Sequence, residues 1–145
     1  MFVSETYSIE DCIKYYSDTY SSSSIVNYTL PTNYKIEFTI FSDSSTSTSS
    51  GSGNTAFIRF DKSDGAYVGK GATSNRNISM NTLALPNTIP VSVDTTYSFS
   101  KKNGALSLSD GTDTVTSSTS SSYTKIYSLN GSSNGKLKTI KVKPL

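Results

Sequence analysis

The sequence predicts an all-β fold of antiparallel strands, and three observations support this prediction. The stretch from Tyr97 to Val115, YSFSKKNGALSLSDGTDTV, alternates hydrophobic and polar residues on both sides of Asn103-Gly104. The stretch from Tyr34 to Phe41, YKIEFTIF, alternates in the same way. Serine and threonine make up about a third of the 145 residues, a composition typical of solvated β surfaces and unfavourable for helices.

The dipeptide Asn103-Gly104 predicts a hairpin with a two-residue primed turn, because both residues tolerate the positive φ angles that this turn requires. In that register Phe99 lies opposite Leu108, and Lys101 lies opposite Leu106. Hydrophobic side chains then share one face and serines the other: Tyr97, Phe99, Leu106 and Leu108 against Ser98, Ser100, Ser107 and Ser109. We expect a sheet with one buried and one solvated face.

Asp110-Gly111 predicts a second turn of the same kind, with Leu106 opposite Val115. This register leaves Asp113 on the hydrophobic face beside Leu108.

Other alternating segments predict the remaining strands. They are residues 56–60 and 66–70, which form a hairpin across residues 61–65, and residues 76–85 and 89–93. Pro86 and Pro90 place the last two at strand ends or sheet edges. Leu137 and Ile140 are out of phase for a regular strand, which predicts a β-bulge at Lys138-Thr139.

Two segments have weaker patterns. Residues 42–53 follow Phe41 and contain no hydrophobic residue. This composition predicts a surface loop. Residues 9–20 carry a helical stripe, but the adjacent tyrosines and the serine run that follows favour extended structure.

Composition excludes several classes of function. The net charge of +2 does not imply binding to nucleic acid or to an anionic membrane. The absence of histidine and the single cysteine, Cys12, exclude an intrachain disulfide and the usual zinc sites. No segment has the length and hydrophobicity of a membrane span, and the N-terminal residues MFVSETYSIE do not form a signal peptide. The C-terminal lysines alternate with hydrophobic residues and indicate a solvated strand face.

The strand YKIEFTIF, the hairpin pair YSFSKKNGALSLSDGTDTV and the closing segment KLKTIKVKPL resemble the concanavalin A-like jelly-roll domains. Within this family the likeness is to laminin-G-like modules and to domains of phage and viral structural proteins. The resemblance implies an antiparallel two-sheet sandwich, which we expect to form a single domain over residues 1–145. It also implies binding of glycans or cell surfaces, although some members are glucanases and others are structural.

The residues argue against catalysis. Glucanases of this family pair carboxylates in an E-x-D-x-E pattern, because a retaining mechanism needs an acid and a nucleophile roughly 5 Å apart. The glutamates of this chain, Glu5, Glu10 and Glu37, do not form such a pattern. Without histidine, Ser-His-Asp and Cys-His systems are also excluded. We therefore expect a protein that is not an enzyme.

Four residues are candidates for ligand binding. Arg59 lies on a strand next to Phe57, and Tyr67 follows a turn, so that an arginine fork and an aromatic ring can meet a sugar. Asp61 and Asp64 of the intervening turn can accept hydrogen bonds from hydroxyl groups. The same two aspartates are an alternative calcium site, although the third carboxylate is missing and a plain hairpin turn also explains them. The plainer alternative for Arg59 is a surface arginine that covers Phe57.

These observations favour a non-catalytic domain that binds a cell-surface glycan or polysaccharide, within a phage or viral structural protein or a surface adhesin. Its expected location is the virion or the cell surface. The alternative is a structural module that holds a virion protein together as a trimer or larger assembly. A glycoside-cleaving enzyme is a third interpretation. Exposed aromatic residues on a concave face would favour the glycan-binding domain. A large hydrophobic patch on a flat face would favour the structural module.

Overall fold

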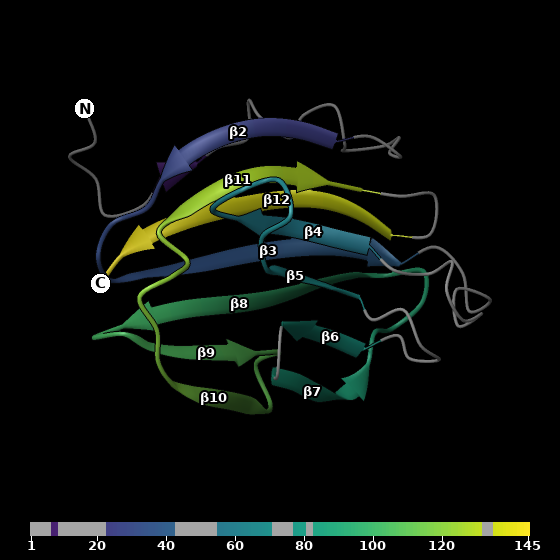
Figure 1. The fold of residues 1–145 in the computed structure, drawn as a ribbon. Helices are drawn as coiled ribbons and strands as arrows, with labels where there is room; N and C mark the ends of the chain where they lie inside the picture. Colours follow the sequence, from purple (N-terminus) through teal and green to yellow (C-terminus); the bar gives the residue numbers. More distant parts are fainter. Residues whose placement is uncertain (1–6, 9–22, 43–54, 71–76, 81–82, 132–134) are drawn as a thin grey trace.

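The computed structural model describes residues 7–8, 23–42, 55–70, 77–80, 83–131 and 135–145. Within these ranges the chain forms twelve β-strands and no helix (Figure 1). The strands are β1 (Tyr7–Ser8), β2 (Ser23–Thr29), β3 (Tyr34–Ser42), β4 (Thr55–Phe60), β5 (Tyr67–Lys70), β6 (Asn77–Met80), β7 (Leu83–Thr88), β8 (Asp94–Lys102), β9 (Ala105–Ser109), β10 (Thr114–Thr119), β11 (Lys125–Asn130) and β12 (Gly135–Pro144). The expectation of an all-β antiparallel fold is confirmed.

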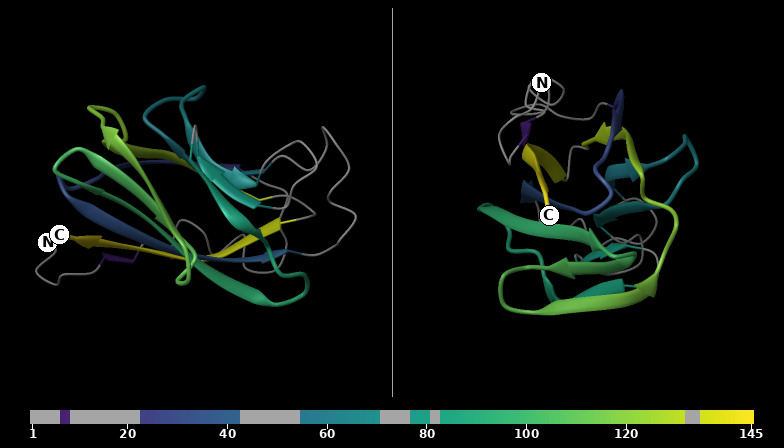
Figure 2. Two further views of the ribbon diagram at one scale, coloured as in Figure 1. Left: turned by 90° about the horizontal axis from the view of Figure 1, so that it is seen from below. Right: turned by 90° about the vertical axis from the view of Figure 1, so that its left-hand side faces the viewer.

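The strands form two sheets, which Figure 2 shows from two further directions. One sheet has the order β1-β12-β3-β8-β9-β10, and the other has the order β2-β11-β4-β5-β6-β7. We call them sheet A and sheet B. The chain changes sheet after β1, β2, β3, β7, β10 and β11, so that residues far apart in sequence line each end of the sandwich.

One hydrophobic core lies between the sheets. Strand β3 shows the alternation that builds it, because its first, third, fifth and seventh side chains are fully buried and those between them are partly exposed. An aromatic cluster joins the two sheets, with the ring centroids of Phe60 and Phe99 5.2 Å apart and those of Phe60 and Tyr123 5.1 Å apart.

The predicted β8–β9 hairpin is confirmed. Phe99 pairs with Leu108, Lys101 pairs with Leu106, and the φ angles of Asn103 and Gly104 are 51° and 81°. The predicted bulge in the last strand is also confirmed, because the register of β12 against β3 shifts between Leu137 and Thr139. The hairpin of β4 and β5 forms as expected.

The predicted register of the next hairpin is wrong. Val115 pairs with Leu108, not with Leu106, because the turn contains four residues instead of two. The Asp110 carboxylate accepts hydrogen bonds from the backbone N–H groups of Thr112 and Asp113, at 2.9 and 2.7 Å, and so stabilises the longer turn. This register also removes Asp113 from the hydrophobic face.

Two predicted single strands are also wrong. Residues 76–85 contain two strands, β6 and β7, with Met80 paired to Leu83. Residues 89–93 form no strand, since they carry the chain from sheet B to sheet A and Ser92 has a φ angle of 65°. Pro86 does lie in an edge strand of sheet B, as expected.

The expectations for Cys12 and residues 9–20, and for all but the first residue of the predicted loop 42–53, lie outside the described residues. Ser42 itself ends β3.

Candidate functional site

The β4–β5 hairpin brings Arg59 and Tyr67 together on the outer face of sheet B. They are directly opposite each other in the strand register, and the Arg59 guanidinium carbon lies 4.9 Å from the centroid of the Tyr67 ring. Arg59 also donates a 2.7 Å hydrogen bond to the carbonyl oxygen of Gly65. The guanidinium is therefore held by a cation–π contact and by one hydrogen bond.

The interpretation of Arg59 as a cover for Phe57 is wrong. Phe57 and Ile58 are both fully buried, since the register of β4 against β5 shifts between Ala56 and Ile58. The bulge turns Phe57 into the core, and Arg59 covers Tyr67 instead.

A hollow of about 360 Å³ lies around this pair, and we call it the Arg59 hollow. Its lining residues come from β4, the turn after it, β5 and β6: Arg59, Asp64, Gly65, Ala66, Tyr67 and Ser79. A Cβ atom at Gly65 would overlap the carbonyl oxygen of Phe60, so the turn that forms one wall requires glycine at this position.

The Arg59 hollow offers donors, an acceptor and a ring. Arg59 has five N–H donors, of which one is directed to Gly65. Asp64 is exposed and lies 3.9 Å from the Lys62 amine, a surface pair that leaves its carboxylate oxygens accessible to hydroxyl donors. Arg59 covers one face of the Tyr67 ring, so a sugar can stack only on the other face.

The structure separates Asp61 from this group. The Asp61 carboxylate accepts hydrogen bonds from the N–H groups of Tyr123 and Thr124, both at 2.9 Å, and from the Thr124 hydroxyl at 3.2 Å. Its φ angle of 71° turns the chain sharply at the end of β4. Asp61 therefore holds the segment before β11, and lies in a different hollow from Arg59, Asp64 and Tyr67.

The calcium alternative stays a prediction. In the described part of the chain, no three Asp, Glu or Cys side chains gather in a way that could hold a metal ion. Asp61 uses its oxygens for backbone N–H groups, and Asp64 faces Lys62.

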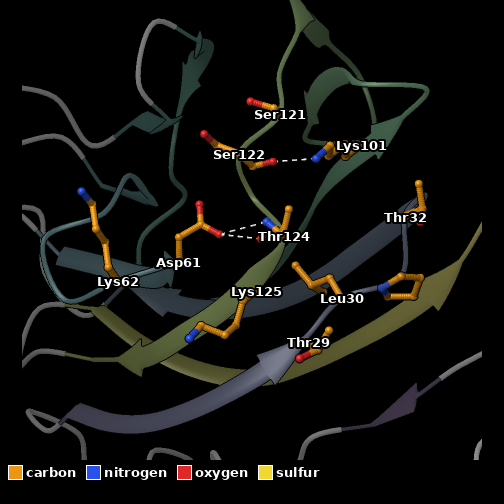
Figure 3. Close-up of a pocket in the computed structure, with 11 residues that line it drawn as sticks. Thr29, Leu30, Thr32, Asp61, Lys62, Lys101, Ser121, Ser122, Thr124 and Lys125 are labelled. Carbon is orange, nitrogen blue, oxygen red and sulfur yellow. Dashed lines mark hydrogen bonds between the residues drawn. The ribbon is translucent and has the colours of Figure 1, made fainter.

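A second, larger hollow of about 810 Å³ opens at the rim of the sandwich, and we call it the rim hollow (Figure 3). It lies where the β2–β3 turn, the β4–β5 turn, the end of β8 and the segment before β11 meet. Its lining residues are Thr29, Leu30, Pro31, Thr32, Asp61, Lys62, Lys101, Ser121, Ser122, Thr124 and Lys125.

Sequence reasoning missed the rim hollow, although one signal pointed to it. Lys101 continues the inward phase of Tyr97 and Phe99 on β8, where a charged residue is unexpected. The segments that complete the hollow come from distant parts of the chain, and no local pattern predicts that they meet.

Comparison with solved structures identifies the fold. Galectin LEC-6 of Caenorhabditis elegans matches with a TM-score of 0.52 and 9% sequence identity, over 99% of this chain and 99% of the galectin chain. Alginate lyase A1-II′, a member of polysaccharide lyase family-7, matches with a TM-score of 0.48 and 14% identity, over 83% of this chain and 66% of the lyase chain. No protein-family model matches the chain, and no curated protein matches its sequence. The likeness shows the fold alone, a concanavalin A-like jelly-roll sandwich.

The expectation that the protein is not an enzyme is corrected by these comparisons, because one of the matching structures is an alginate lyase. The absence of the E-x-D-x-E pattern and of histidine argues only against the reactions that need those groups. They do not exclude other chemistry on this fold. The likeness to the lyase assigns no reaction to this chain.

Among the described residues there is no helix long and apolar enough to span a membrane.

Proposed function

We propose that the protein is a glycan-binding jelly-roll domain and that the Arg59 hollow is its binding site. The observation that supports this most directly is the fixed pair of Arg59 and Tyr67, with the exposed carboxylate of Asp64 in the same hollow. A guanidinium donates to ring and hydroxyl oxygens, a carboxylate accepts from hydroxyls, and an aromatic ring packs against the apolar face of a sugar.

The fold supports the proposal in a general way, since a galectin matches along nearly the whole chain. The surface gives no specific support for a purely structural module. In the described parts of the chain, the large hydrophobic side chains that are exposed lie on three separate segments: Ile25, Val93 and Leu145. They do not indicate one hydrophobic patch on a flat sheet face.

The ligand we propose is a cell-surface glycan or polysaccharide. The setting in a phage or viral structural protein, or in an adhesin, is a proposal that rests on the sequence resemblance. Assembly into a trimer is also a proposal that rests on the resemblance. Light scattering after size-exclusion chromatography would test it.

The experiment that tests the site combines a glycan-array screen with variants. The screen identifies the ligand, and calorimetry then measures its affinity for Arg59→Ala and Tyr67→Ala. Each variant should bind about 1 to 2 kcal/mol more weakly, which is typical for losing a charged hydrogen bond or an aromatic contact. Tyr67→Phe keeps the ring and should retain most of the affinity.

Lys141→Ala is the matched control, because Lys141 is an exposed cation on β12 of the other sheet. It should bind like the unmodified protein. Thermal unfolding of each variant shows whether a loss of binding is a loss of folding. If Arg59→Ala and Tyr67→Ala both fold and bind normally, the proposed site is wrong.

A further inference from the structure

We propose that the rim hollow is a second binding site, separate from the Arg59 hollow, and that it takes a sugar unit bearing an anionic group, with Lys101 as the residue that holds the anion. This site is not part of the function proposed above. It rests on one buried cation, a preorganised wall and a lining of hydroxyl groups.

Lys101 is a buried cation with spare donors. It pairs with Tyr34 of β3 and Leu106 of β9, both of them core residues, and only 8% of its surface is exposed. Its amine donates a 2.6 Å hydrogen bond to the carbonyl oxygen of Ser122, toward which it points in Figure 3. An ammonium group has three N–H donors, and within the described ranges Ser122 is the one acceptor of the Lys101 amine, so two donors are available to a ligand.

No carboxylate of the described residues lies within ion-pair distance of Lys101. The Lys101 amine therefore has no counter-ion among the described residues, and an anion that enters the hollow can pair with it. The fixed direction of the amine also lowers the entropy that binding would lose.

The wall beside Lys101 is held in place from several sides. The Tyr34 hydroxyl donates to the carbonyl oxygen of Tyr123 at 2.7 Å, and the Leu30 N–H donates to the carbonyl oxygen of Thr124 at 3.0 Å. The Asp61 carboxylate accepts from the N–H groups of the same two residues, Tyr123 and Thr124. The segment before β11 is thus fixed without a ligand. Because Asp61 is bound to these backbone donors, its repulsion of an incoming anion is reduced.

The lining favours a ligand with many hydroxyl groups. Five exposed hydroxyl side chains surround the hollow: Thr29, Thr32, Ser121, Ser122 and Thr124. Hydroxyls both donate and accept, as sugar hydroxyls do. One buried cation among many hydroxyls, with Lys62 and Lys125 also in the lining, matches a sugar that carries carboxylate or sulfate groups.

The two hollows share no lining residue, although both include residues of the β4–β5 turn. Asp61 and Lys62 line the rim hollow, whereas Asp64 and Gly65 line the Arg59 hollow. Variants can therefore test one site without removing residues of the other.

The test uses the unmodified protein with trigalacturonic acid, and with the methyl ester of the same trisaccharide as the neutral control. Calorimetry should show the acid binding at least about tenfold more tightly than the ester, a preference that weakens as salt screens the charge. Equal affinities for acid and ester would overturn the proposal. Inorganic sulfate should bind more weakly than the acid, and equal binding of sulfate would overturn the assignment to a sugar.

Lys101→Met removes the ammonium and keeps the side-chain stem, and it should abolish the preference for acid over ester. Lys102→Met, at the exposed neighbouring position, should keep the preference. Arg59→Ala should also keep it, which separates this site from the one proposed above. If the preference survives in folded Lys101→Met protein, the proposal is wrong.

Amide chemical shifts of the unmodified protein give a second measurement that does not depend on the folding of a variant. The acid should shift Thr32, Ser122 and Thr124. Shifts confined to Tyr67 and Ser79 would instead place the acid in the Arg59 hollow and overturn the proposal.

Discussion

At the scale of single residues, the position of a charge in the sequence did not reveal its use. Asp61 and Asp64 are three residues apart in one turn, and both were predicted to accept hydrogen bonds from a ligand. In the structure Asp61 binds the backbone of a segment 62 residues away, whereas Asp64 stays exposed beside Lys62. Which backbone N–H groups need an acceptor is decided by the tertiary fold. Arg59 and Tyr67 were predictable as a pair because hairpin register is a local property.

A buried tyrosine gives a residue-scale prediction about pH. Burial raises the pKa of Tyr97 from 10.0 to about 12, and the negative charge of Asp110 acts in the same direction. The folded-state pKa is therefore above that of the unfolded chain. The protonated Tyr97 hydroxyl therefore contributes to folding stability. This contribution is fully present below pH 10 and is lost as the pH rises toward 12. Urea unfolding midpoints measured across this range should fall with pH.

Tyr97→Phe is the control for this prediction, because it removes the ionisable hydroxyl and keeps the ring that stacks on Phe38 at 5.8 Å. The two proteins share all other tyrosines, so the difference between the two curves isolates Tyr97. Parallel curves above pH 10 would show that Tyr97 does not titrate with a raised pKa.

At the scale of elements, hairpins were predicted well where the turn is formed by backbone preferences alone. The Asn103-Gly104 turn has this character. The following turn was mispredicted because the Asp110 side chain forms hydrogen bonds that lengthen it, and Asp-Gly can start either turn. In β11 the register shifts between Ile126 and Ser128, and Tyr127 at that point is only partly buried. The bulge in β12 was predicted because Leu137 and Ile140 are out of phase, whereas the sequence analysis found no such signal in β11.

The Asn103-Gly104 turn gives an element-scale prediction. Gly104 has a φ angle of 81°, which β-branched residues adopt only with strain. Gly104→Val should lower the free energy of unfolding by about 1 to 3 kcal/mol, the usual scale of backbone strain. Gly104→Asn is the control, since asparagine tolerates positive φ, and it should cost less. Equal stability of the valine variant and the unmodified protein would contradict the observed turn.

At the scale of the whole molecule, both sheets contribute to one core, and this couples the sites to the fold. The aromatic cluster contains Tyr34 and Phe99 from sheet A and Phe60 from sheet B. Tyr123 packs against two of these rings, and its chain neighbours Ser122 and Thr124 line the rim hollow. The rim hollow therefore exists only when the two sheets are stacked.

This shared core predicts that the described sandwich unfolds as one unit. Far-ultraviolet circular dichroism reports the strands, and tyrosine fluorescence reports buried rings such as Tyr34, Tyr97 and Tyr123, in a chain without tryptophan. In urea the two signals should change together in a single transition, as expected for one cooperative domain. The folded spectrum should show well under about a fifth helix, below the one-third average of globular proteins. Two separate transitions would mean that the sheets do not share one core, and the preorganised wall beside Lys101 would then lose its physical basis.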